Sequence, residues 1–334
     1  MKYVPRLISA NENQNLLSAV LICVFLSTSS TGGASEDSVK TPPSPKRIEI
    51  PAYCEPLIAR LAENRGKKIS AVIESNRFQV MRGLKKHEDF FGPPFSRMLA
   101  RLGKGDILVD VGAGTASALL DYEDEIKFGR YVKNPEDRPE VVSIIASLPT
   151  KEHYTPLPGI SQTDFNRAIN RLSIAMTELS PNDFRVLHGR LLEDIPIEEI
   201  AKPGTVAGLI DKVGACAYTE NLTEDLSKEI SLLKEGGEGF LDFHNFTQIY
   251  PYLEEGFDLQ TVLGARNPVQ DRKMSIPQFL SHVQGIKVID ADQFGRVYFI
   301  KTSEIVKVPL LRLRYIDDET PPPTRIFTFD PPLK

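Results

Sequence analysis

The chain has 334 residues, of which 41% are hydrophobic and 25% are charged, and its formal net charge is −5. This composition is typical of a globular protein that is large enough for one large core or two smaller ones. The slight acidity and the lack of a strongly basic region argue against a nucleic-acid partner. The three cysteines, Cys23, Cys54 and Cys216, lie far apart and lack the spacing of metal ligands, so we expect no metal site.

The first 34 residues are organised like a signal peptide. Two basic side chains stand within residues 1–15, the stretch Leu16–Leu26 is almost wholly apolar, and small residues follow in 27–35. This order predicts export to the periplasm or out of the cell. The apolar stretch is shorter than the roughly 20 residues of a membrane-spanning helix, so we expect membrane contact only through this segment. The alternative is a cytoplasmic protein with a disordered or interfacial N-terminal tail.

Two further segments precede the main domain. Residues 35–50 are polar and rich in proline, which predicts a flexible linker. Residues 51–102 have a mainly helical pattern and predict an N-terminal helical segment. If the first cysteine is removed with a signal peptide, Cys54 and Cys216 remain as an even pair that could form a disulfide.

From residue 103 onward, apolar runs alternate with amphipathic stretches. The first apolar run, Ile107–Val111, predicts a buried strand, and a helix is expected to start at Ser117 after two closely spaced glycines. The further expected strands and helices are Val141–Ala146, Asp164–Leu179 (helix), Arg185–His188, Val206–Asp211, Leu222–Leu233 (helix) and Gly239–Phe243. This alternation predicts an α/β domain over residues 103–310, with a mostly parallel, doubly wound sheet between two layers of helices.

The end of the chain has a different pattern. Two apolar runs, Ile286–Asp290 and Arg296–Lys301, flank a short connection and predict a β-hairpin. Residues 311–334 contain the run Pro321–Pro323 and the pair Pro331–Pro332, and predict an extended, proline-rich tail.

The run Ile107–Ala116 has the sequence ILVDVGAGTA and resembles motif I of the class I S-adenosylmethionine-dependent methyltransferases, whose pattern is acid-x-Gly-x-Gly-x-Gly. Asp110, Gly112 and Gly114 match this pattern, and Ala116 stands where the family most often has a third glycine. Strand, glycine loop and helix N-terminus together make a place where the backbone can approach a ligand closely.

The resemblance extends along the chain. The segment Leu233–Gly237 resembles the Leu-x-x-Gly-Gly element that precedes the fifth strand in many members, although a plain helix C-cap would have the same sequence. In all, the resemblance covers roughly residues 90–301. It implies a Rossmann-like sheet of seven strands that ends in a C-terminal antiparallel hairpin, with S-adenosyl-L-methionine as the cofactor.

The candidate cofactor site lies at the glycine loop. Gly112, Ala113 and Gly114 would bring backbone N–H groups to the cofactor, because glycine has no β-carbon in the way. The resemblance implies that Asp110 faces the ammonium group of the methionine portion. The alternative is that Asp110 satisfies backbone donors of the loop or of the next helix.

A second part of the site is expected after the third strand, where family members often place an acid against the adenine amino group. Glu193 or Asp194 would fill this role by resemblance, and the alternative is a solvated helix start. Tyr218 and Thr219 follow the fourth strand and are candidate substrate contacts. No catalytic base stands out, but methyl transfer can proceed through proximity and alignment.

One departure from the family concerns the ribose. The second strand ends in the sequence of residues 145–148, Ile-Ala-Ser-Leu, without the acid that usually binds the ribose hydroxyls. A dinucleotide site is the competing interpretation of the glycines, and it needs a comparable acid. The leading hypothesis is methyl transfer to an unidentified acceptor. The alternative is an exported, non-catalytic protein that keeps the fold.

Overall fold

The computed structural model describes residues 82–131, 134–145, 161–180, 183–188, 192–243, 247–252, 273–315 and 325–333. All of them belong to one compact unit that spans Ile48–Lys334. Within these ranges, no helix combines the length and the apolar character needed to cross a membrane. The predicted signal peptide, the linker and the beginning of the N-terminal helical segment lie outside the described residues.

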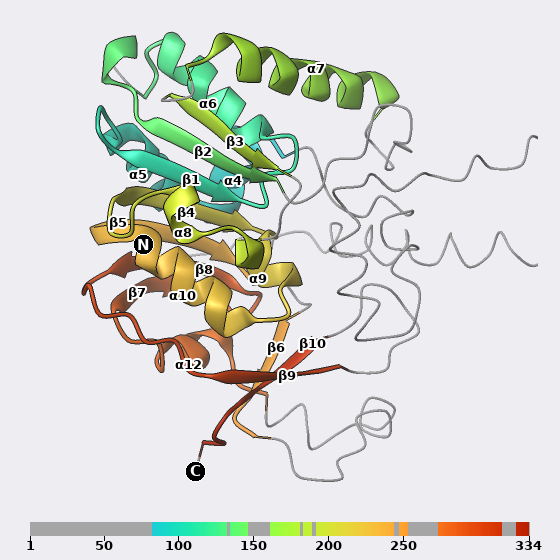
Figure 1. Cartoon of the computed structure of the whole chain (residues 1–334), viewed down its shortest axis with the longest axis vertical. Coiled ribbons are helices and arrows are strands. Elements are labelled where there is room, and N and C mark those ends of the chain that lie inside the picture. Colours follow the sequence, from blue (N-terminus) through green and yellow to red (C-terminus); the bar gives the residue numbers. More distant parts are fainter. Residues whose placement is uncertain are drawn as a thin grey trace, which may run out of the picture. The chain divides into compact units, whose positions relative to one another are not determined.

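A seven-stranded sheet with the order β3-β2-β1-β4-β5-β8-β7 forms the centre of the domain (Figure 1). Strands β1 to β5 pair in parallel, β8 is antiparallel to β5, and β7 is antiparallel to β8. The bounds are β1 Ile107–Val111, β2 Glu140–Ile145, β3 Phe184–His188, β4 Val206–Lys212, β5 Leu233–Asp242, β7 Ile286–Ala291 and β8 Arg296–Lys301. The predicted fold is therefore confirmed: a Rossmann-like, mostly parallel sheet of seven strands with a C-terminal antiparallel hairpin.

The central strand β1 explains why the sheet was visible in the sequence. Four of its five residues are buried, because helices cover both faces of a parallel sheet and the strand becomes a nearly continuous apolar run. Its side chains alternate between two cores. Leu108 belongs to the core under one layer of helices, whereas Val109 and Val111 belong to the core under the other.

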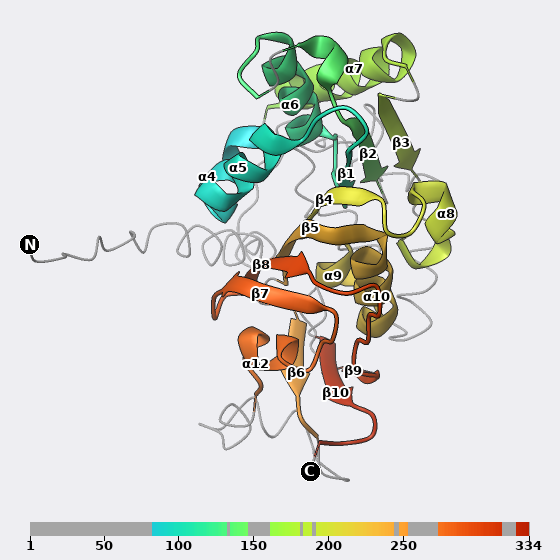
Figure 2. The same ribbon diagram turned by 90° about the vertical axis from the view of Figure 1, so that its left-hand side faces the viewer.

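Helices cover the sheet on both faces. One core contains side chains of α4 Leu84–Phe91, α5 Pro93–Arg101, α6 Ser117–Lys127 and α7 Gln162–Glu178. The other contains side chains of α8 Ile197–Ile200, α9 Ala215–Tyr218, α10 Leu222–Leu232 and α12 Ile276–Leu280. Figure 2 shows α4 and α5 on the opposite side of the sheet from α8 and α10. Two 3-10 turns, η2 Pro135–Asp137 and η3 Leu192–Asp194, complete the described helical elements.

The predicted C-terminal tail is wrong. Residues 311–334 contain β9 Leu311–Tyr315 and β10 Arg325–Phe329, and β10 pairs in parallel with β6 Thr247–Tyr250 and antiparallel with β9. Phe327 is buried in the same core as α10 and α12. The prolines obscured these strands because they flank β10 without interrupting it, and a proline breaks a strand only from within.

The glycine pair at the start of β5 also differs from expectation. Helix α10 ends at Leu232, and the chain enters β5 at once, so the pair is not a helix C-cap. The register between β4 and β5 shifts after Val206, which leaves an irregularity around the two glycines. A β-carbon on Gly237 would come within 2.9 Å of the Val206 carbonyl oxygen. Glycine is therefore required for the close approach of the two strands.

Candidate functional site

The loop after β1 has the backbone shape of a glycine-rich turn. Gly112 and Gly114 have φ angles of 76° and 58°, which glycine adopts without strain. Ala116 also has a positive φ, 54°, and it is the N-cap residue of α6. Alanine therefore takes the left-handed conformation that a third glycine would adopt freely. The chain keeps the shape of the motif at the position where its sequence departs from it.

This loop touches the loop after β4 through the backbone. A β-carbon on Gly112 would stand 2.3 Å from the Cα of Gly214, and one on Gly214 would stand 2.1 Å from the carbonyl oxygen of Val111. Strand β1 has β2 on one side and β4 on the other, so the chain order reverses here. Ligands of open α/β sheets bind at the carboxyl ends of the strands beside such a switch point.

The first two N–H groups of the loop are already hydrogen-bonded. Gly112 and Ala113 both donate to the carbonyl oxygen of Ile144 in β2, at 2.9 and 3.0 Å. These donors fix the loop to the end of the neighbouring strand. They are therefore not available to a ligand in this conformation.

The side chain of Asp110 is buried beside the glycine loop. Asp110 is only 2% exposed, and its Oδ2 atom has no hydrogen-bond partner among the described residues. Burial, together with the charge of Asp211, raises the pKa of this carboxyl group to about 8, while the charge of Arg82 opposes the shift. A buried polar atom without a partner is rare in proteins. Asp110 thus has one carboxyl oxygen that a cationic ligand could satisfy.

The two candidate acids of η3 differ in their surroundings. Glu193 is partly buried and accepts a hydrogen bond of 2.7 Å from the Thr219 hydroxyl group, whereas Asp194 is exposed. Lys228 of α10 donates to the carbonyl oxygens of Leu192, Glu193 and Ile195, at 2.7 to 3.0 Å. The turn is therefore anchored to α10, and Glu193 is the better positioned of the two acids.

The structure describes the side chain of only one of the two candidate substrate contacts after β4, Thr219 and not Tyr218. The Thr219 hydroxyl also accepts the N–H of Asn221 at 2.9 Å, so Thr219 joins its own turn to Glu193. The side chain of Tyr218 lies outside what the structure describes. Cys216 is a buried free thiol, and its predicted partner Cys54 lies outside the described residues.

Lys212 was missed in the sequence. Its Nζ atom lies 3.2 Å from the centroid of the Phe90 ring and 3.9 Å from Oδ2 of Asp242. Burial lowers the pKa of this amine to about 8, although the charge of Asp242 opposes the shift. The sequence contained one indication, because Lys212 directly follows Asp211 near the end of the fourth strand. Lys212 adds an amine with a lowered pKa to the carboxyl edge of the sheet.

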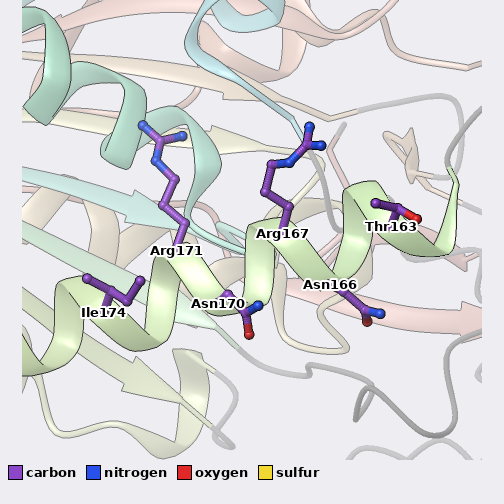
Figure 3. Close-up of a pocket in the computed structure, with 6 residues that line it drawn as sticks. All are labelled: Thr163, Asn166, Arg167, Asn170, Arg171 and Ile174. Carbon is purple, nitrogen blue, oxygen red and sulfur yellow. The ribbon is translucent and has the colours of Figure 1, made fainter.

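Two surface hollows flank the domain. One lies between η3 and α10, and both candidate acids and Lys228 line it. The other is formed by one face of α7 (Figure 3), where its lining residues are Thr163, Asn166, Arg167, Asn170, Arg171 and Ile174. In the second hollow, Arg171 is held by ion pairs of 2.6 and 2.5 Å with Asp121 and Asp124 of α6. The α7 hollow includes none of the predicted site residues.

The segment where an acid would bind the ribose hydroxyls, Ala146–Leu148, lies outside the described residues, because it follows the last described residue of β2. The predicted site residues that are described fall into two groups. Asp110 and the glycine loop adjoin the end of β4, and the acids of η3 are joined through Thr219 to the turn after β4.

Comparison of the sequence with protein-family models finds no match, and a search among curated proteins finds none either. Solved structures with a similar fold include a SAM-dependent methyltransferase from Aquifex aeolicus, with 14% identity, a TM-score of 0.35, and coverage of 66% of this chain and 97% of that chain. A 1,6-didemethyltoxoflavin-N1-methyltransferase from Burkholderia thailandensis, with bound S-adenosylhomocysteine, has 16% identity, a TM-score of 0.32 and coverage of 70% and 89%. A putative class I methyltransferase from Listeria monocytogenes has 12% identity, a TM-score of 0.34 and coverage of 77% and 70%. The strand order of the central sheet, β3-β2-β1-β4-β5-β8-β7, defines the fold of this chain.

Proposed function

We propose that this protein binds S-adenosylmethionine at the carboxyl end of β1 and transfers its methyl group to an acceptor. The observation that carries the proposal is the unpaired, buried Oδ2 atom of Asp110 beside the glycine loop. A cationic ligand at this point would satisfy the oxygen and hold the carboxyl group in its charged form. The ammonium group of the methionine portion has the required charge.

The other described residues support the same ligand. Glu193 is held at the edge of the domain by Thr219 and could accept a hydrogen bond from the adenine amino group. The backbone contact between Gly112 and Gly214 fixes the relative position of the loops after β1 and β4. When bound, the cofactor supplies an electrophilic methyl group. The chain's own residues then hold and align the reactants, which can account for much of the acceleration of such a reaction.

Binding can be measured by isothermal titration of the full chain with S-adenosylmethionine and with S-adenosylhomocysteine. Asp110→Asn keeps the shape of the side chain but removes its charge, and we expect at least about tenfold weaker binding, equivalent to about 1.4 kcal/mol. Asp106→Asn is the matched control, because Asp106 lies just before the opposite end of β1, where it accepts hydrogen bonds from Gly103 and Lys234. The control should bind as the wild type does.

The titration also separates the two hypotheses. Folded wild-type protein that binds neither compound would refute the enzyme and favour a non-catalytic protein that keeps the fold. Equal binding by the Asp110→Asn variant would refute the role of Asp110 alone.

Export is a separate proposal that rests on the signal-peptide pattern of the first 34 residues. S-adenosylmethionine is expected mainly inside cells, so export would favour the non-catalytic hypothesis. N-terminal sequencing of the protein made in its own host tests it: a mature chain that begins near residue 35 supports export, and a chain that begins at Met1 refutes cleavage.

A further inference from the structure

A group of acidic and sulfur ligands is enclosed behind the end of β4, on the side of α10. Asp211 of β4, Cys216 of α9 and Glu229 of α10 each present one ligand atom, and these atoms all lie within 4.8 Å of one another. All three side chains have no exposed surface. The three residues come from three elements that the fold brings together at one point.

Backbone donors fix the geometry of this group. Asp211 accepts the N–H of Gly214 at Oδ1, at 2.6 Å, and the N–H of Cys216 at Oδ2, at 2.7 Å. The Sγ atom of Cys216 lies 3.8 Å from Oε2 of Glu229. A carboxylate oxygen has two lone pairs, so each oxygen of Asp211 can still bind a further partner.

A fourth acid extends the group. Asp225 has no exposed surface, and neither of its carboxyl oxygens has a hydrogen-bond partner of normal geometry among the described residues. The Thr219 hydroxyl is near, but it directs its proton to Glu193. Asp225 lies one helical turn before Glu229 on the same face of α10. Its charge raises the pKa of both Cys216 and Glu229, after the larger effect of their own burial.

Among the described residues, no ion pair joins a basic side chain to Asp211, Asp225 or Glu229, although the charge of Lys228 opposes the rise in pKa that burial causes at Asp225. Buried carboxyl groups are stable when they are paired with a cation, coordinate a metal ion or remain protonated. The nearby ammonium group of Lys228 donates to three carbonyl oxygens of the η3 region. A cation among Asp211, Cys216 and Glu229 would compensate the carboxylate charges and bind the thiol.

We propose that Asp211, Cys216 and Glu229 bind one divalent cation of the zinc type, beside the unpaired carboxyl group of Asp225. A sulfur ligand with carboxylates suits zinc, whereas magnesium and calcium prefer oxygen ligands alone. The thiol proton and any carboxyl protons leave to solvent when the ion binds. The three ligands come from β4, α9 and α10, so a bound ion would join these elements in an enclosed site. Cysteine spacing could not reveal it, because it uses a single cysteine.

The proposal is tested with the full chain after treatment with a chelator. Equilibrium dialysis against Zn²⁺ with elemental analysis should give about one ion per chain, and Co²⁺ should produce a thiolate-to-cobalt charge-transfer band. Cys216→Ser should abolish the band, and Glu229→Gln should weaken Zn²⁺ binding by about tenfold or more. Cys54→Ser is the matched control and should keep both the band and the stoichiometry.

The outcomes are distinct from those of the methyltransferase proposal. Substoichiometric zinc in the folded wild type would overturn the site, as would a cobalt band that survives Cys216→Ser. If Cys216→Ser does not fold, zinc K-edge absorption of a Cys23→Ser, Cys54→Ser double variant replaces it. One sulfur neighbour supports the site in that measurement, and a shell of oxygen and nitrogen alone refutes it.

Discussion

Gly112 and Gly214 meet backbone to backbone, and a β-carbon on Gly112 would stand 2.3 Å from the Cα of Gly214. Gly112 also has a φ angle of 76°. Gly112→Ala therefore combines conformational strain with a collision against backbone, which cannot move aside as a side chain can. We expect a loss of at least about 3 kcal/mol in the free energy of unfolding, measured by chemical denaturation.

The chain provides a matched control for this prediction. Gly129 has a nearly identical φ of 75°, but a β-carbon there would meet nothing within 4 Å. Gly129→Ala should cost only the strain, about 1 to 2 kcal/mol. Equal losses for the two variants would show that the contact with Gly214 does not matter.

The raised pKa of Asp110 predicts a pH-dependent affinity for S-adenosylmethionine. With a pKa of about 8, this carboxyl group is mostly protonated in the free protein at neutral pH. A cationic ligand requires the charged form, so binding below pH 8 releases a proton. Affinity should therefore rise by up to about tenfold per pH unit between pH 6 and pH 8. Titration calorimetry in buffers of different ionisation enthalpy would detect the released proton, and Asp110→Asn should remove the slope.

The two acids of η3 provide a comparison between neighbours. Glu193 is partly buried and accepts a hydrogen bond from Thr219, whereas Asp194 is exposed. We expect Glu193→Gln to weaken S-adenosylmethionine binding by about tenfold to 150-fold, which corresponds to the roughly 1.5 to 3 kcal/mol of a hydrogen bond to a charged group. Asp194→Asn should change it less than twofold. The reverse order in a binding titration would assign the adenine contact to Asp194.

His87 predicts acid sensitivity of the fold. Its ring is 3% exposed, and Nδ1 donates to the Gly83 carbonyl oxygen at 3.1 Å. Burial is the main cause that lowers the pKa of His87 from 6.5 to about 3; the hydrogen bond to Gly83 opposes the shift, and the charges of Lys212 and Arg82 contribute to it. The unfolded chain thus binds one more proton between pH 6.5 and pH 3. Stability should fall with falling pH in this window, by up to about 1.4 kcal/mol per unit.

This contribution can be isolated by substitution. His87→Gln keeps an amide that can donate to Gly83 but does not titrate, so the loss of stability toward acid should become shallower. His282→Gln is the control, because His282 is exposed. Denaturation curves at pH 7, 5.5 and 4.5 would give the slopes, and a wild-type slope in the His87→Gln variant would contradict the prediction.

The core of the fold was predictable because burial on both faces of the sheet leaves long apolar runs. The expected strand Val206–Asp211 matches β4, which ends one residue later, and the expected helix Leu222–Leu233 matches α10 to within one residue. The small sheet of β6, β9 and β10 was not predictable. Its strands are short and flanked by prolines, and β10 pairs with β6 across a long separation in sequence, with Arg325 opposite Thr247.

The only part of the site that could be predicted from the sequence is the part formed by a single local motif. The glycine loop is local, so its sequence alone indicated the turn and the position of Asp110. Lys212 could not be assigned, because its lowered pKa depends on burial and on Phe90, which lies far away in the sequence. The same is true of the proposed cation ligands, since Glu229 reaches Cys216 only after α10 has packed against β4.

The reactivity of Lys228 reports how often the η3 turn opens. All three protons of its ammonium group are committed to the carbonyl oxygens of Leu192, Glu193 and Ile195. An amine-reactive label can attack Lys228 only after it leaves these partners and loses a proton. Mass spectrometry can measure the acylation rate of this one lysine. That rate therefore measures how often the turn that carries Glu193 opens.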